Sequence, residues 1–171
     1  MLKHNRLVKN AISSILNSYS MIFFSKNQVF GVLLLIVSFF DIYAGLAGII
    51  SVITANLAAR LLGLNFNNIE NGIYGFNALL VGMGLGIALE LSVPFFAILL
   101  FISLATLFVT LIFEGVLGKY GLPYLTIPFL LVIWLSQLAI RNYAGLTPSE
   151  GDIYALNTMY GRGGQLMVDI Y

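Results

Sequence analysis

Long apolar stretches separated by single charged residues set the limits on what this chain can fold into. Four stretches of roughly 18–23 residues carry no charge at all, which is close to the ~20 residues that a helix needs to cross a bilayer. A fifth, shorter run has the same character. The five stretches lie between Lys26 and Asp41, Asp41 and Arg60, Glu70 and Glu90, Glu90 and Glu114, and Lys119 and Arg141. The spacing predicts an all-α integral membrane protein with its charges at the helix ends.

The composition supports this prediction. Apolar residues make up 60% of the 171 residues and charged residues 9%, with a formal net charge of +1. A soluble domain is closer to half apolar and a quarter charged, so these few charges could not cover a water-facing surface. The same figures exclude a disordered chain and a basic nucleic-acid-binding surface. The absence of cysteine excludes disulfides and thiolate metal sites, and we expect neither a metal nor a cofactor.

The N-terminal stretch has a different pattern. Residues 1–10 form a basic tail with Lys3, Arg6 and Lys9, which favours a cytoplasmic N-terminus. From Val8 to Phe23, apolar residues recur at helical spacing opposite asparagines and serines, which predicts an amphipathic helix. Such a helix either anchors the chain at the interface or lines a channel, and its pattern leaves both open. No small-residue cleavage site follows it, so it is not a signal peptide.

The stretch from Gly72 to Glu90 is apolar and unusually rich in glycine. One interpretation is close packing between helices through small residues. The other is a half-helix that enters the bilayer over residues 72–82 and ends near its middle, where its free backbone oxygens could bind a solute.

A second irregular segment is Leu122 to Phe129. Pro123 and Pro128 remove two N–H donors, and the Thr126 hydroxyl lies between them. The segment is either the kinked start of a helix or part of a permeation path. No charge stands in the middle of a span, so a path here suits a small neutral solute rather than an ion.

Enzyme activity finds no support in the sequence. The one histidine, His4, lies in the basic tail, and no motif pairs a nucleophile with a base or binds phosphate. We therefore expect a protein that is not an enzyme.

Three motifs, in order along the chain, resemble those of the urea transporter family. The first is Ser20 to Asn27. The second is the run Gly-Ile-Tyr-Gly-Phe-Asn that begins at Gly72 and continues to Gly82, and the third is Leu-Pro-Tyr-Leu-Thr-Ile-Pro-Phe at Leu122 to Phe129. The resemblance covers roughly residues 16–143.

The resemblance implies a passive urea channel of two inverted repeats, each with five membrane helices and one re-entrant pore helix. It also implies a homotrimer in the plasma membrane, or in the inner membrane of a bacterium, with urea and membrane lipid as its partners. This chain corresponds to the first repeat over residues 1–143, with 72–82 as the re-entrant segment that supplies backbone oxygens. Residues 144–171 resemble an exposed linker, with the second repeat missing.

The motifs also suggest which residues bind urea. By position they place Ile22, Phe24, Phe76 and Leu80 along an apolar slot and the Thr126 hydroxyl at its constriction, with Met21 and Gly82 as further pore-lining residues. Met21 stands where the family commonly has glutamine, so an amide oxygen is replaced by an apolar group. The alternatives are a channel for ammonia or short amides, or a membrane assembly module that transports nothing.

Overall fold

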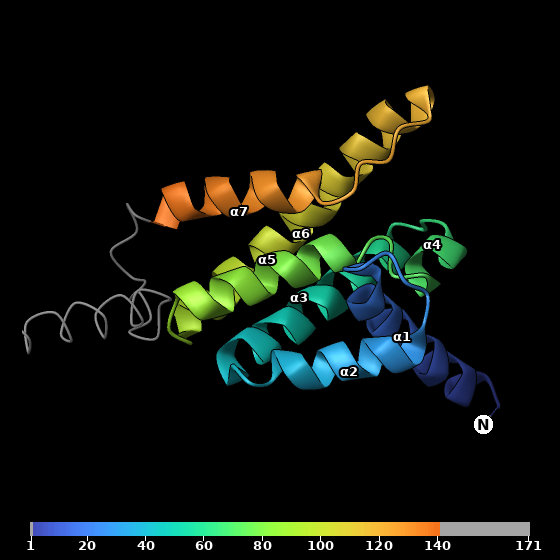
Figure 1. Cartoon of the computed structure of the whole chain (residues 1–171), viewed down its shortest axis with the longest axis horizontal. Coiled ribbons are helices and arrows are strands. Elements are labelled where there is room, and N and C mark those ends of the chain that lie inside the picture. The colour runs from blue at the N-terminus through green and yellow to red at the C-terminus, as the bar shows by residue number, and fades with distance from the viewer. Residues whose placement is uncertain (1, 141–171) are drawn as a thin grey trace, which may run out of the picture.

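The structure, a computed structural model, describes residues 2–140, and side chains from residue 9 onward. This range contains helices and no β-strand, which confirms the all-helical prediction (Figure 1). The helices are α1 (Leu2–Met21), α2 (Gln28–Ser38), α3 (Ile42–Leu61), α4 (Phe66–Glu70), α5 (Phe76–Ala88), α6 (Val93–Leu117), the 3-10 turn η1 (Gly118–Tyr120) and α7 (Ile127–Ile140). The basic residues 3–9 belong to the first turns of α1, whereas the predicted linker 144–171 lies outside the described residues.

Two of these helices are long and apolar enough to span a membrane. They are α3, with 20 residues, and α6, whose span of 26 residues runs to Gly118. The apolar helices α2, α5 and α7 have only 11, 13 and 14 residues. They are shorter than the charge-free stretches that predicted them, because turns at 39–40, 71–75 and 121–126 each occupy part of one stretch. The number of membrane crossings, about five in the sequence analysis, stays a prediction.

The first two helices run side by side in the same direction. The Gln28 amide nitrogen donates to the Ser13 hydroxyl over 2.7 Å, and Gly31 lies against the backbone of Leu16. The start of α2 is therefore level with Ser13, although α1 continues to Met21. At 1.5 Å per residue, α1 extends about 12 Å beyond the level where α2 begins. The chain turns back at residues 22–27 before α2 starts (Figure 1).

The polar face of α1 is turned into the bundle. Ser14, Asn17, Ser18 and Ser20 are buried, whereas Ile12 is 54% exposed. Buried hydroxyls must find partners, and those of Ser14 and Ser18 donate to α1 carbonyls one turn earlier. The Asn17 amide nitrogen donates to the Glu70 carbonyl over 2.7 Å. The predicted amphipathic helix is present, and its polar side contacts protein rather than water.

Among the described helices, α3 and α5 form the most extensive contact. They run in opposite directions, with Gly75 beside Asn56, Gly82 beside Ala47 and Gly86 beside Tyr43. A Cβ atom added to Gly82 or Gly86 would lie 2.6 Å from the carbonyl oxygen of Ala47 or Tyr43. The glycines of the 72–90 stretch therefore let two backbones approach closely, as the packing interpretation predicted.

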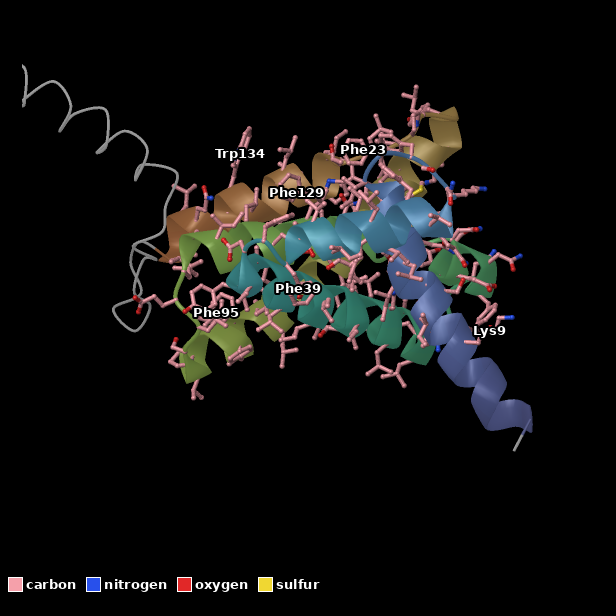
Figure 2. All side chains as sticks on the ribbon, turned by 60° about the horizontal axis from the view of Figure 1, so that its bottom comes forward. Lys9, Phe23, Phe39, Phe95, Phe129 and Trp134 are labelled. Atoms are coloured by element: carbon pink, nitrogen blue, oxygen red, sulfur yellow. The ribbon has the colours of Figure 1, made fainter. Side chains whose placement is uncertain are left out.

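The last two helices cover the other side of α5. Ile133 of α7 contacts Gly84, and the apolar core around Leu85 and Leu89 continues through Phe95 and Leu99 of α6. Helix α7 runs beside α5 (Figure 1). Apolar side chains also cover the outside, and the 61%-exposed Trp134 projects from α7 away from the bundle (Figure 2). This exterior suits a lipid environment.

A matched pair of glycine substitutions tests the α3–α5 contact. Gly82→Ala should destabilise the chain by roughly 1–3 kcal/mol, because the new methyl group meets the Ala47 backbone, which cannot move aside. Gly115→Ala in α6 should stabilise by up to about 1 kcal/mol, since alanine favours helix and nothing lies within 4 Å. Thermal unfolding in detergent measures both. Equal effects of the two substitutions would contradict the close contact.

Candidate functional site

The end of α1 presents backbone oxygens that no other group uses. The helix ends at Met21, and the amide of Phe24 then donates to the Met21 carbonyl over 2.9 Å. The amide of Ser25 donates to the Ser20 carbonyl over 3.1 Å. Among the described residues, no hydrogen bond ends on the carbonyls of Ile22, Phe23 or Phe24. A helix end leaves such acceptors free unless a cap or a ligand satisfies them.

The reversal that follows is held in a strained conformation. Phe24 has φ +55°, which a bulky side chain rarely adopts. The Ser20 hydroxyl lies 2.8 Å from the Ser25 carbonyl and, with the backbone bond between the same two residues, fixes the turn. Strain of this kind persists only where its surroundings enforce it, and it is typical of functional sites.

The loop before α7 is the second irregular segment of the site. Leu125, within the Leu122–Phe129 motif, has φ +47°. Its carbonyl accepts a hydrogen bond from the side-chain amide of the fully buried Asn77 over 3.3 Å. The neighbouring Thr126 is half-buried, and its hydroxyl makes no hydrogen bond to any described residue. Thr126 can therefore both donate to and accept from a solute.

These segments meet at the start of α5. Gly75 packs against the Ser18 hydroxyl of α1, and Asn77 holds the loop before α7. One turn further along α5, Leu80 lines a cavity of about 350 Å³ together with Ile22. Side chains of α1, α2, α3 and α5 and of the α2–α3 connection, which contributes Phe40 and Asp41, complete its wall. The structure thus brings the end of α1 and the start of α5 to one largely apolar cavity, with the α7 loop attached through Asn77.

The other residues predicted for the site differ in their placement. Phe24 is 53% exposed and Met21 is half-buried at the end of α1. Phe76 is only 2% exposed, so its ring packs inside the helical layer rather than facing an open slot. Gly82 faces α3, where Ser51 and Ala47 cover it. Their roles in solute binding stay predictions.

Residues 72–82, predicted to be re-entrant, include both a turn and part of a helix, and their re-entrant course stays a prediction. Residues 71–75 form turns, and the helix begins at Phe76 and continues to Ala88, past all the glycines. Helix α5 keeps its internal hydrogen bonds along the glycine-rich part. Free carbonyls lie at residues 22–24, where only the side chains of Ile22 and Phe24 were predicted to contact the solute.

A polar cluster that was not predicted from the sequence lies beside the loop before α7. The Asn68 amide nitrogen donates to the Tyr74 hydroxyl over 3.1 Å and to the Glu114 carboxylate over 3.3 Å. Burial first, and then the nearby Glu114 and Tyr74, raise the pKa of Tyr124, so its buried hydroxyl stays neutral. Glu114 was predicted only to lie at the membrane interface. Its neighbours Tyr74 and Tyr124 belong to other segments, so the local sequence around Glu114 does not reveal the cluster.

No metal site accompanies these groups in residues 2–140, where no three His, Cys, Asp or Glu side chains lie together. The chemistry of the site consists of neutral oxygen acceptors, one free hydroxyl and walls that are apolar except for Asp41. Such groups bind a neutral molecule that carries hydrogen-bond donors.

Comparison with known proteins agrees with these motifs. The family described as "Urea transporter" matches residues 12–167. The chain belongs to the urea transporter family. Members of this family are membrane proteins that transport rather than catalyse, which is the class predicted from the sequence.

Individual relatives carry the same name. Urea transporter 1 of the goat, Capra hircus, is 27% identical over 139 residues, which cover 79% of this chain and 36% of the goat protein. Urea transporter 1 of the mouse, Mus musculus, is 26% identical over 153 residues, or 87% of this chain and 40% of the mouse protein. The chain therefore spans about two fifths of the length of the relatives it matches.

The hydrogen bond from Asn77 to the α7 loop can be tested by hydrogen exchange. Asn77→Leu leaves the Leu125 carbonyl without its donor, and we expect the loop amides around Leu122 and Ile127 to exchange roughly tenfold faster. Asn56→Leu is the control, because Asn56 is also buried but bonds to Ser14. Equal acceleration in both variants would show general destabilisation and contradict a specific anchor.

Proposed function

We propose that this chain forms one wall of a passive urea pore. The observation that carries the proposal is the run of free carbonyls at Ile22, Phe23 and Phe24, which follow the end of α1 in a turn with two exposed phenylalanines. Urea is flat, neutral and rich in N–H donors, so removing its hydration requires replacement acceptors along the route. Three successive carbonyls supply them.

The apolar side chains supply the other half of the selectivity. Ile22, Phe23 and Leu80 line one cavity, and the next residue, Phe24, has an exposed ring. Ile22, Phe24, Leu80 and Thr126 carry no charge, and the Asp41 carboxylate in the cavity wall already accepts from the Tyr43 and Ala44 amides at the start of α3. An anion would lose its hydration there without compensation, whereas urea loses only hydrogen bonds that the carbonyls and Thr126 replace.

Helix α1 takes the role that the sequence analysis gave to residues 72–82. It ends at Met21, and the chain returns to the level of Ser13 before α2 begins. In a membrane this is the course of a re-entrant segment, with the negative end of the helix dipole directed at the solute. The N–H donors of urea favour that end.

The wall opposite this one comes from a second unit of the same fold, inserted in the reverse orientation. The exposed Phe24 and the half-buried Thr126 are then covered by equivalent groups across the pore. The family resemblance favours three such subunits in the plasma membrane, or the inner membrane if the source is bacterial. The exposed apolar face of α6 offers surface for lipid or for neighbouring subunits.

The Thr126 hydroxyl provides the first test. When the full-length protein is reconstituted in proteoliposomes, Thr126→Val should lower urea flux by at least about threefold, because one hydrogen bond to the solute is lost. Thr54→Val is the control, since Thr54 is also half-buried but its hydroxyl is satisfied by the Ile50 carbonyl. Absence of urea flux above the lipid background in the unmodified protein would overturn the proposal and leave an assembly module.

The width of the slot provides a second test. Phe24→Ala should widen the slot and raise the permeability to N,N′-dimethylurea relative to urea by about tenfold. Phe108→Ala is the control, because Phe108 on α6 is almost equally exposed, at 51% against 53%. Ammonia needs no wide planar slot, so ammonia flux that exceeds urea flux in every variant would favour the ammonia channel instead. A monomeric chain that carries urea by itself would contradict the one-wall arrangement.

A further inference from the structure

A cavity between α1 and α3 combines one cationic side chain with an apolar floor. It has a volume of about 240 Å³ and lies apart from the site described above. Asn56 forms part of its inner wall. The other lining residues are Ala11, Ser14 and Ile15 from α1 and Ile53, Leu57 and Arg60 from α3.

Arg60 has unused hydrogen-bonding capacity in this cavity. Its Nε atom is buried, and no described group accepts a hydrogen bond from it. No carboxylate within residues 9–140 pairs with its guanidinium, and its nearest aromatic partner is the Phe66 ring, 6.0 Å away. A guanidinium binds phosphate oxygens in a fixed two-pronged geometry, so an anion would satisfy it.

The apolar residues continue from Arg60 in one direction. Leu57 and Ile53 follow at helical spacing, which places Ile53 about 10 Å from Arg60 along the α3 axis. Both side chains are about half exposed and face outward beside α1. A free inorganic anion would not contact these apolar side chains, whereas an acyl chain would cover them.

Further basic residues lie near the groove. Arg60 stands in the last turn of α3, and the cavity joins it to Ala11, close to the basic first turns of α1. Helix α1 contains Lys3, Arg6 and Lys9 and no acidic residue, and Lys9 lies near this end of the molecule (Figure 2). Asp41, the N-cap of α3, and Glu90, which follows α5, belong to the opposite end of the bundle. Glu70 and Glu114 lie at the Arg60 end, where Asn17 bonds to the Glu70 carbonyl and Asn68 to the Glu114 carboxylate. The basic end corresponds to the cytoplasmic leaflet, where anionic lipids concentrate.

We infer that this groove binds an anionic phospholipid, with the headgroup phosphate on Arg60 and an acyl chain along Leu57 and Ile53. The lipid would join α1 to α3 from outside. It would thereby support the helix whose far end carries the free carbonyls, without entering the solute path. The inference depends on membrane location and not on the identity of the solute.

Native mass spectrometry of the purified chain in detergent tests the headgroup. Phosphatidylglycerol and phosphatidylcholine with identical acyl chains are the probes, and we expect phosphatidylglycerol to bind about tenfold more tightly. Arg60→Gln should remove this preference. Lys119→Gln, which removes the same charge from η1 outside the groove, should keep it. An unchanged preference in Arg60→Gln would overturn the inference.

A second variant tests the apolar half and covers the case in which Arg60→Gln fails to fold. Leu57→Trp fills the groove, so it should weaken phosphatidylglycerol binding by about tenfold with Arg60 intact. Inorganic phosphate is the competitor. Displacement of the lipid by millimolar phosphate, or full lipid binding by Leu57→Trp, would show a simple anion site or no groove and would overturn the assignment. Thermal unfolding confirms that each variant is folded.

Discussion

The close contact between α3 and α5 positions almost everything else in the molecule. Glycines at 82 and 86 lie against carbonyl oxygens of α3, so the two backbones approach within a distance that no larger residue permits. The contact fixes the level at which α5 begins. That level is beside Ser18 of α1, and it brings Asn77 to the loop before α7. Without the α3–α5 contact, the end of α1, the start of α5 and the loop before α7 would not be held together as one wall of the proposed pore.

The location of backbone groups without hydrogen-bond partners explains where the proposed site lies. A bilayer provides no water to satisfy a free N–H or C=O group, so a helix end inside it requires a partner. The polar face of α1 obtains partners from its own turns and from Glu70. The carbonyls of residues 22–24 obtain none among the described residues. In the proposed pore, a solute with N–H donors would be their transient partner.

The motifs identified the family, but they did not identify which group of each motif acts. The first motif was interpreted through the side chains of Ile22 and Phe24, although its distinctive feature in the structure is its backbone. The second was interpreted as a source of free oxygens, although its glycines serve helix packing and Phe76 is buried. Both assignments depended on where a helix stops. Glycine and proline spacing cannot decide that, because either residue is compatible with a turn or with a packed helix.

The sequence by itself determined the class, the helical content and the family of this protein. Charge-free stretches of membrane length leave few alternatives, and the Leu122–Phe129 motif is specific. Only the tertiary structure decided that α1 extends about 12 Å past the start of α2, that Asn77 holds Leu125 and that Arg60 lacks a partner. These features depend on contacts between residues as far as 48 positions apart. Local spacing carries no information about such contacts, since they arise only when the helices pack.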